Sequence, residues 1–330
     1  MRYKSIIVTR KGPPDVLQVI ENDLRPPSAS EARIKILATL VCGPDVTSRY
    51  GRTPFAPKVP FVPGYAIIGV VDAIGPDVTK AAVGDRVAAM TVYGGYAEYI
   101  FLDQKELIPV PATLDPAEAV TLILNYMVAY QTLHRAAKVK AGYKVLIIGA
   151  SGGVGTAFLQ LGKLANLSMY GIASASKHSV LTEHGATPID YHTQDFVEVI
   201  RRAEPGGLDA VFDGMGGDYL ERGFSLLRRG GTLVEYGNPL GFSGLLLLLA
   251  KVILFNVLPN GKTVKLYGNS FRFNRRPFLK DWATLFKLLE EGRIKPVIMK
   301  KFPILEAAKA NQLLESGQVI GNVVLLAKDE

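Results

Sequence analysis

The sequence predicts an α/β fold with two domains, a small and partly open β-barrel and a doubly wound parallel sheet. Its 330 residues exceed what one ordinary hydrophobic core contains. Short β-rich runs with closely spaced Gly and Pro fill the first third of the chain, as in a small barrel. The middle of the chain then alternates apolar strands with segments long enough for crossover helices, which is typical of a parallel sheet.

The first domain is expected to be mainly β-structure up to about Pro109. Its Gly and Pro spacing fits a barrel better than alternating strands and helices. The predicted strands are Ser5 to Thr9, Ala32 to Ala38, Ile67 to Ala73, Arg86 to Met90 and Ala97 to Phe101.

The parallel sheet is expected to follow a helical stretch from Asp115 to Leu133. Lys144 to Gly149 is almost continuously apolar, as in a strand buried on both faces. Later strands are predicted at Ser168 to Ala173, at Ile189 and Asp190, at Ala210 to Asp213, and at Thr232 to Tyr236.

The C-terminal tail is expected to rejoin the first domain. An amphipathic helix is predicted from Phe278 to Glu290, and a closing strand from Gly321 to Ala327. We therefore assign residues 1–124 and 266–330 to the first domain and residues 125–265 to the second.

Composition limits the location and the partners. A single cysteine, Cys42, excludes an internal disulfide and indicates a reducing compartment. Residues 1–10 lack the apolar core and cleavage site of a signal peptide, so a cytoplasmic location is expected. Most of the basic residues behind the net charge of +8 are scattered, and the one cluster, at 272–280, has no nucleic-acid motif. We expect a solvated basic surface and no nucleic-acid partner.

A glycine-rich loop follows the first buried strand of the second domain. The sequence from Gly149 to Gly155 is GASGGVG, and Thr156 to Ala165 has the pattern of an amphipathic helix. A strand, such a loop and a helix together are typical of a dinucleotide-binding turn, where the helix N-terminus binds the phosphates. The residues expected to bind the cofactor here are Ala150, Ser151, Gly152, Gly153, Val154 and Gly155.

The residues that follow the next strand indicate which dinucleotide binds. NAD enzymes place an acidic residue there, about 20 residues after the glycines, to bind the ribose hydroxyls. This chain instead has Ser174, Ser176 and Lys177. Two hydroxyls and a cation favour a 2′-phosphate, so NADPH is expected over NADH. The alternative is that a serine caps the next helix and Lys177 is merely solvated.

Further motifs occur along nearly the whole chain. They are Gly12 to Leu17, Pro63 to Gly69, Val83 to Val87, Gly94 to Tyr99, Ala186 to Tyr191, Phe212 to Gly217 and Arg229 to Leu233. Together with the glycine loop they resemble the medium-chain dehydrogenase/reductase superfamily, and within it the quinone oxidoreductases and the vesicle amine transport protein relatives. The resemblance implies a GroES-like catalytic domain, a Rossmann-type cofactor domain and an active site between them. This chain matches the family pattern at Asp45 and, among the residues on the cofactor side, at Tyr191, Gly237 and Asn238.

The same resemblance also allows a test for the ligands of a catalytic zinc ion. Zinc alcohol dehydrogenases of the superfamily have a ligand cysteine near the position of Cys42 and a His-Glu pair directly after the glycine that matches Gly64. Here that pair is Tyr65-Ala66. Because a catalytic zinc typically needs three protein ligands, we expect no metal. Cys42 is then either a small residue lining the active site or an inert buried thiol.

Without a metal, the expected chemistry is hydride transfer from NADPH to an electron-poor carbon of a hydrophobic quinone or α,β-unsaturated carbonyl compound. The candidate catalytic residues are Asp45, Tyr50, Tyr65, Asn125 and Tyr126. For each tyrosine, ordinary packing in the core or at its rim is an alternative of at least equal weight. The alternative function is that of a nucleotide-binding, membrane- or partner-associated protein with little turnover.

The segment from Gly244 to Leu258 is unusually apolar. It is too short to span a bilayer, and Lys251 and Asn256 interrupt it. A helix that is apolar all round is expected to be buried. The candidate roles are a lid over an apolar substrate, an oligomer contact and a membrane-docking helix, of which the first two are favoured. The strand from Thr263 to Tyr267 is a candidate edge for pairing two subunits of a homodimer.

Overall fold

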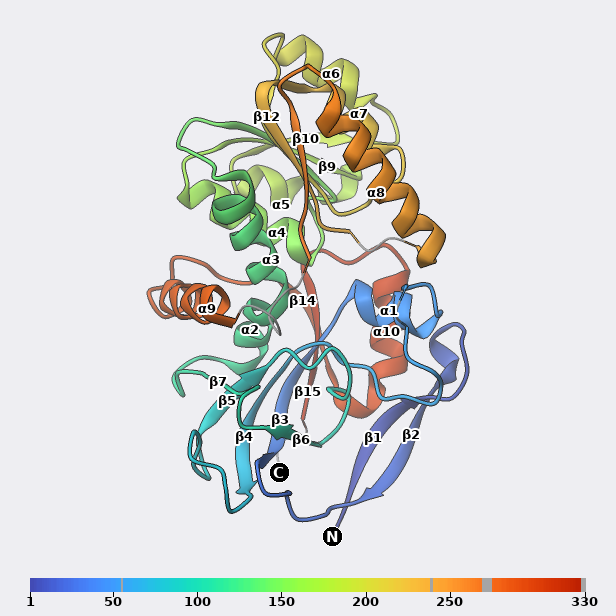
Figure 1. Cartoon of the computed structure of the whole chain (residues 1–330), viewed down its shortest axis with the longest axis vertical. Helices are drawn as coiled ribbons and strands as arrows, with labels where there is room; N and C mark the ends of the chain where they lie inside the picture. The colour runs from blue at the N-terminus through green and yellow to red at the C-terminus, as the bar shows by residue number, and fades with distance from the viewer. Residues whose placement is uncertain (55, 238–239, 269–274, 328–330) are drawn as a thin grey trace. The chain divides into compact units, whose positions relative to one another are not determined.

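The computed structural model describes residues 1–54, 56–237, 240–268 and 275–327. The chain divides into two compact units (Figure 1). Unit 1 comprises Met1–Leu124 and Trp282–Glu330, and unit 2 comprises Asn125–Asp281.

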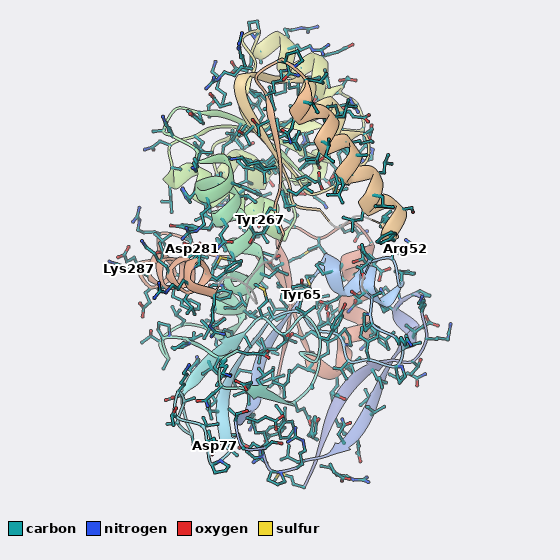
Figure 2. The ribbon with its side chains drawn as sticks, viewed as in Figure 1. Arg52, Tyr65, Asp77, Tyr267, Asp281 and Lys287 are labelled. Carbon is teal, nitrogen blue, oxygen red and sulfur yellow. The ribbon has the colours of Figure 1, made fainter. Side chains whose placement is uncertain are left out.

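The second boundary lies further along the chain than the sequence-based division at 265 and 266. It falls inside helix α9 (Arg275–Glu290). The carboxylate of Asp281, labelled in Figure 2, accepts hydrogen bonds from Arg135 Nε at 2.6 Å and from Gln131 Nε2 at 2.7 Å. These contacts keep the first part of α9 with unit 2.

Unit 1 is built around a sheet whose central strand, β3 (Glu31–Val41), alternates buried and half-buried residues. Among the described residues this sheet has seven strands in the order β14-β15-β3-β4-β5-β7, with β6 also paired to β3. Strands β1 and β2 form a separate antiparallel pair. The remaining strands are β1 (Arg2–Val8), β2 (Leu17–Asp23), β4 (Ile67–Ile74), β5 (Arg86–Ala89), β6 (Tyr99–Asp103), β7 (Ile108–Pro109), β14 (Ile298–Pro303) and β15 (Asn322–Leu326).

The C-terminal tail belongs to unit 1, because β15 pairs antiparallel with β3. The helices of this unit are short and lie between the strands in sequence. They are η1 (Pro14–Val16), α1 (Gly43–Arg49), α2 (Pro116–Thr121), η5 (Ile304–Glu306) and α10 (Ala307–Glu315).

Unit 2 is a doubly wound parallel sheet. Its six described strands run in the order β10-β9-β8-β11-β12-β13, which is the strand order of a dinucleotide-binding domain. The strands are β8 (Lys144–Ile148), β9 (Ser168–Ala173), β10 (Ala186–Asp190), β11 (Leu208–Asp213), β12 (Leu227–Glu235) and β13 (Thr263–Leu266).

Helices cover both faces of this sheet, with α4 on one side and α7 and α8 on the other (Figure 1). The predicted helical stretch near the start of the unit is confirmed and contains two π-helical segments. The helical elements are η2 (Leu122–Tyr126), α3 (Met127–Gln131), η3 (Thr132–Ala137), α4 (Gly153–Leu164), η4 (Ala175–Lys177), α5 (His178–Glu183), α6 (Phe196–Ala203), α7 (Tyr219–Ser225) and α8 (Gly241–Val257).

The expectation that the apolar segment is buried is wrong for this chain. Helix α8 has no buried residue. One face packs on the core of unit 2 through Leu248, Val252 and Phe255, which are partly buried. The other face is open, and Ile253 there is 66% exposed and Val257 71% exposed. Within the described ranges, no helix has the length and apolar character needed to cross a membrane.

Helix α8 also covers part of the edge of the sheet. The Asn256 side chain donates to the carbonyl of Val264 and accepts from its N–H, both at 2.9 Å. Val264 lies in β13, the last strand of the sheet. The Asn256 side chain therefore already bonds to backbone groups of β13 that a second subunit would need in order to pair with this edge.

Unit 1 contains a partly buried ion pair whose loss should lower the free energy of unfolding. The Arg49 side chain is 1% exposed and bonds to Glu315 and to the carbonyl of Gly12. Glu315→Ala leaves this cation buried without its partner, so the free energy of unfolding should fall by about 3 kcal/mol in urea denaturation. Glu306→Ala, which removes an exposed pair with Lys309, is the control and should cost about 0.5 kcal/mol or less. Equal losses in both variants would contradict the prediction.

Candidate active site

The loop between β8 and α4 has the geometry expected of a dinucleotide-binding turn. Gly149 has φ of +77°, a left-handed conformation that favours glycine. A Cβ on Gly155 would lie 2.3 Å from the carbonyl oxygen of Gly149, so only glycine fits there. Helix α4 begins at Gly153, three residues earlier than expected, and its N-terminal amides therefore lie within the predicted phosphate-binding residues.

The end of β9 carries hydroxyl and amino groups in place of a carboxylate. Ser174 follows the strand directly, and its Oγ lies 3.4 Å from Ser176 Oγ. The Ser174 side chain makes no capping hydrogen bond to η4, which weakens the alternative that it is only a helix cap. Burial lowers the pKa of the nearby Lys177 amino group.

The other predicted cofactor residues lie in two further loops of unit 2. Tyr191 directly follows β10 and is 48% exposed, and its ring contacts that of His192 with centroids 4.1 Å apart and planes tilted by 38°. Gly237 follows β12, and its N–H donates to Glu235 Oε1 at 2.9 Å. Asn238 lies outside the described residues.

Two buried carboxyl groups at this edge of the sheet were not among the predicted site residues. Asp213 ends β11 and Glu235 ends β12, and the two residues are register partners. They are 0% and 3% exposed. Burial raises the pKa of both carboxyl groups, and the pKa of Glu235 reaches about 9. In the sequence, the only sign of the pair was an acidic residue at the end of one predicted strand, Asp213, and one residue before the end of another, Glu235.

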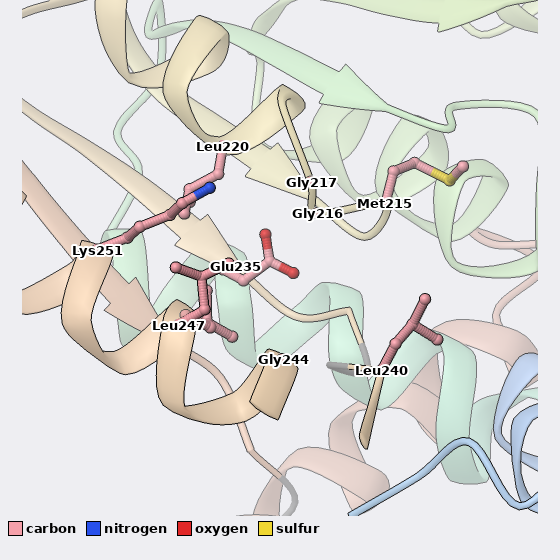
Figure 3. A pocket seen from close by; sticks show the side chains of 10 residues that line it. Met215, Gly216, Gly217, Leu220, Glu235, Leu240, Gly244, Leu247 and Lys251 are labelled. Atoms are coloured by element: carbon pink, nitrogen blue, oxygen red, sulfur yellow. The ribbon is translucent and has the colours of Figure 1, made fainter. Parts of the chain in front are cut away.

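A pocket of about 270 Å³ lies beside Glu235, between the loop that follows β11 and helix α8 (Figure 3). Most of its lining is apolar or glycine. The carboxyl group of Glu235 points toward Gly216 and Gly217 in this view. Lys251, from α8, forms an ion pair with Glu221 at 2.9 Å. The lining residues are Met215, Gly216, Gly217, Leu220, Glu235, Leu240, Gly244, Leu247, Leu248 and Lys251.

In unit 1, Asp45 is the centre of a buried hydrogen-bond network. Its Oδ1 accepts from the N–H of Gly64 at 2.9 Å, and its Oδ2 accepts from Tyr96 Oη at 3.2 Å and Cys42 Sγ at 3.1 Å. Burial raises the pKa of Asp45 to about 6, although these hydrogen bonds oppose the shift. Asp45 thus fixes the start of α1 and the backbone of Gly64, next to Tyr65.

The remaining candidate catalytic residues lie in different parts of the two units. Tyr50, at the end of α1, donates to Glu315 Oε2 at 2.9 Å. Tyr65 is partly buried in unit 1. Asn125 and Tyr126 lie in the π-helical segment η2, and such segments are frequent at functional sites. Tyr126 is fully buried and donates to Gln160 at 2.9 Å, which favours a packing role.

The fold and these loops define a two-domain α/β protein with a GroES-like unit and a Rossmann-like unit. Residues 28–112 match the alcohol dehydrogenase GroES-like domain family, and residues 184–325 match the zinc-binding dehydrogenase family. The chain belongs to the medium-chain dehydrogenase/reductase superfamily, as the sequence predicted. This membership supports an oxidoreductase with a nicotinamide cofactor.

Individual relatives are similar over almost the full length. The synaptic vesicle membrane protein VAT-1 homolog of Rattus norvegicus is 31% identical over 99% of this chain and 85% of its own length. Quinone oxidoreductase from Lama guanicoe is 29% identical over 98% of each chain. The solved structure of Escherichia coli quinone oxidoreductase complexed with NADPH has a TM-score of 0.87 and 26% identity, covering 98% of this chain and 99% of that one.

The environment of Cys42 predicts a low chemical reactivity. Its side chain is 5% exposed, and burial and the adjacent Asp45 raise the thiol pKa well above its ordinary value. Thiolate is the reactive form, so iodoacetamide should modify native protein far more slowly than the same protein unfolded in urea. Mass spectrometry of this single cysteine measures both rates. Comparable rates would show that the thiol is accessible, as expected for a residue lining the active site.

Proposed function

We propose that this protein is an NADPH-dependent reductase that transfers hydride, without a metal, to an electron-poor carbon of a quinone or an α,β-unsaturated carbonyl compound. The observation that carries the proposal is the glycine loop at β8 combined with an end of β9 that has Ser174 and Lys177 in place of an acid. A carboxylate there would bind ribose hydroxyls and repel a 2′-phosphate. Membership of the superfamily supports the same reaction class.

The residues of unit 2 fit a dinucleotide phosphate. Gly155 leaves room for the pyrophosphate to approach the backbone, and the N-terminus of α4 stabilises its negative charge. Ser174 and Lys177 would bind the 2′-phosphate, and Tyr191 and the loop at Gly237 would contact the remainder of the cofactor. When bound, NADPH supplies the hydride.

Several observations support chemistry without zinc. The thiol of Cys42, the one cysteine, is hydrogen-bonded to Asp45 inside unit 1. The positions after Gly64 hold Tyr65 and Ala66, neither of which is a usual zinc ligand. Across the residues with described positions, no three His, Cys, Asp or Glu side chains are grouped to hold a metal ion. The matched zinc-binding dehydrogenase region, 184–325, does not include these positions.

The proposed substrate is hydrophobic. The pocket beside Glu235 is bounded by Leu247 and Leu248 of α8, which supports a role for this helix in covering an apolar molecule. Tyr50, Tyr65 and Asn125 are the proposed polar contacts to the substrate oxygen. Asp45 would act indirectly, by holding the backbone beside Tyr65.

The proposed cofactor choice gives a specific prediction. Lys177→Ala removes the cation that is proposed to face the 2′-phosphate, so the Kd for NADPH should rise roughly 10- to 100-fold while the Kd for NADH stays nearly constant. Nicotinamide fluorescence measures both constants. Lys163→Ala, at the far end of α4, is the matched control and should change neither. An equal effect of Lys177→Ala on both dinucleotides would remove the phosphate assignment.

A second candidate function follows from the open face of α8. Apolar side chains of this helix, among them Phe242 at 62% and Leu246 at 53% exposure, would suit a partner protein, a second copy in a homodimer, or a membrane surface. A nucleotide-binding protein with little turnover would use this face for association.

One pair of measurements separates the two functions. A reductase should oxidise NADPH when given small quinones or 2-alkenals, at a rate unaffected by chelators, and should remain unbound in a liposome flotation assay. Tight NADPH binding without turnover would favour the second function, and flotation with liposomes that is lost in a Phe242→Ser, Ile253→Ser variant would identify the membrane as the partner. Stoichiometric zinc in elemental analysis would contradict the metal-free mechanism.

A further inference from the structure

We propose that Asp213 and Glu235 share a single proton, and that this proton holds together the two loops that follow β11 and β12. Glu235 is then a positioning residue for the site at this edge of the sheet. The expected effect on NADPH binding rests on the proposed function. The shared proton and the contact between the loops do not depend on it.

The hydrogen bonds of the four carboxyl oxygens leave one oxygen of each residue without a donor. Asp213 Oδ1 accepts from the N–H groups of Met215 at 2.8 Å and Gly216 at 3.0 Å. Glu235 Oε1 accepts from the N–H of Gly237 at 2.9 Å. The remaining oxygens, Asp213 Oδ2 and Glu235 Oε2, are buried and have no donor as long as both groups are ionised.

A single proton satisfies both of these oxygens. Register partners on adjacent parallel strands carry their side chains on the same face of the sheet, so the two carboxyl groups lie side by side. Two buried carboxylates at such close range repel each other, and one of them retains a proton, as in other carboxyl pairs. A hydrogen bond between the protonated group of Glu235 and the carboxylate of Asp213 then links the strands.

The pair connects loops that are already in direct contact. A Cβ on Gly237 would lie 2.7 Å from Glu235 Oε1 and 2.8 Å from the carbonyl oxygen of Gly214, so the two loops touch backbone to backbone. The N–H of Tyr236 donates to the carbonyl of Asp213 at 2.8 Å. If the proton is lost, two negative charges face each other at this contact, and the loops should separate.

Few other charged groups act on the pair. Burial is the main cause of the raised pKa of both acids, and their mutual repulsion is the next cause for Glu235. Asp218 adds a smaller repulsion to Asp213. The other titratable groups near the pair, in the loop, in β12 and in the facing helices α7 and α8, are Tyr219, Glu221, Tyr236 and Lys251.

The sign of the pH dependence follows from the direction of the shift. The pKa of Glu235 rises from 4.5 to about 9, so the folded protein keeps a proton that the unfolded chain releases in this interval. The contribution of the pair to stability therefore falls as the pH rises from 4.5 to about 9. In the folded protein itself the proton leaves only near pH 9, and the loops should loosen there.

The first test uses the protein without cofactor. Amide hydrogen exchange is measured from pH 7 to pH 10 and expressed as protection factors, which correct for the intrinsic effect of pH. The amides of Met215, Gly216 and Gly237 should lose about tenfold in protection for each pH unit above the pKa of the pair, because their closed state then requires one proton. In Glu235→Gln an amide replaces the shared proton with a fixed N–H donor, and the protection should no longer depend on pH.

The second test measures the Kd for NADPH over the same pH range by nicotinamide fluorescence. The wild-type Kd should be constant to about pH 8 and then rise up to about tenfold per pH unit. Glu235→Gln and Asp213→Asn should each remove this rise, since either amide can donate to the remaining carboxylate. Asp218→Asn, which changes an exposed acid in the same loop, is the matched control. It should keep the rise and move it only slightly to lower pH, because Asp218 adds a smaller repulsion to Asp213.

The results separate the inference from the proposed function. Parallel pH dependence in the wild type and Glu235→Gln, or no loss of protection up to pH 10, would overturn the shared proton. A pH-dependent protection that disappears in Glu235→Gln would support it even if NADPH does not bind. Absence of NADPH binding at pH 7 would overturn the proposed function alone.

Discussion

The close approach of Gly155 to the backbone of the preceding loop is the constraint on which the proposed cofactor site depends. With no side chain there, helix α4 starts against the end of β8, and its first amides face the edge of the sheet where the other strands also end. Parallel strands place every following loop at this edge. One tight contact therefore fixes the position of the proposed phosphate site, and the strand order brings the loops after β9, β11 and β12 to the same edge of the sheet.

The sequence was most informative where a local pattern sets the structure. Buried parallel strands need continuous apolar runs, and tight turns need glycine, so the strand at Lys144 and the loop to Gly155 were predicted within a few residues. The polar strand β2 was missed, because most of its residues face solvent and its pairing with β1 is decided by tertiary contacts. Likewise, the boundary inside α9 depends on Asp281 meeting Arg135, which are far apart in the sequence.

The parts of the site that were not predicted all depend on register between distant residues. Whether Asp213 and Glu235 face each other is decided by how β11 aligns with β12, and one residue of slippage would turn one carboxyl group to the opposite face. The contact of Asp45 with Tyr96 likewise joins residues that are far apart in the sequence. For α8, the apolar composition predicted burial, but composition does not determine how much of a helix surface the rest of the chain covers.

An acid pair with a single negative charge also changes the electrostatics of this edge of the sheet. Two ionised carboxylates beside the proposed dinucleotide site would repel the phosphates across a poorly screened interior, whereas a shared proton halves that charge. The chain thus combines the absence of an acid after β9 with partial neutralisation of the acids that end β11 and β12. Both features reduce negative charge near a site proposed for a cofactor with an additional phosphate, and the second also adds a hydrogen bond between two loops. Because a proton held by burial depends on the surrounding packing, apolar residues that line the same pocket as Glu235, such as Leu248, help to keep this proton in place.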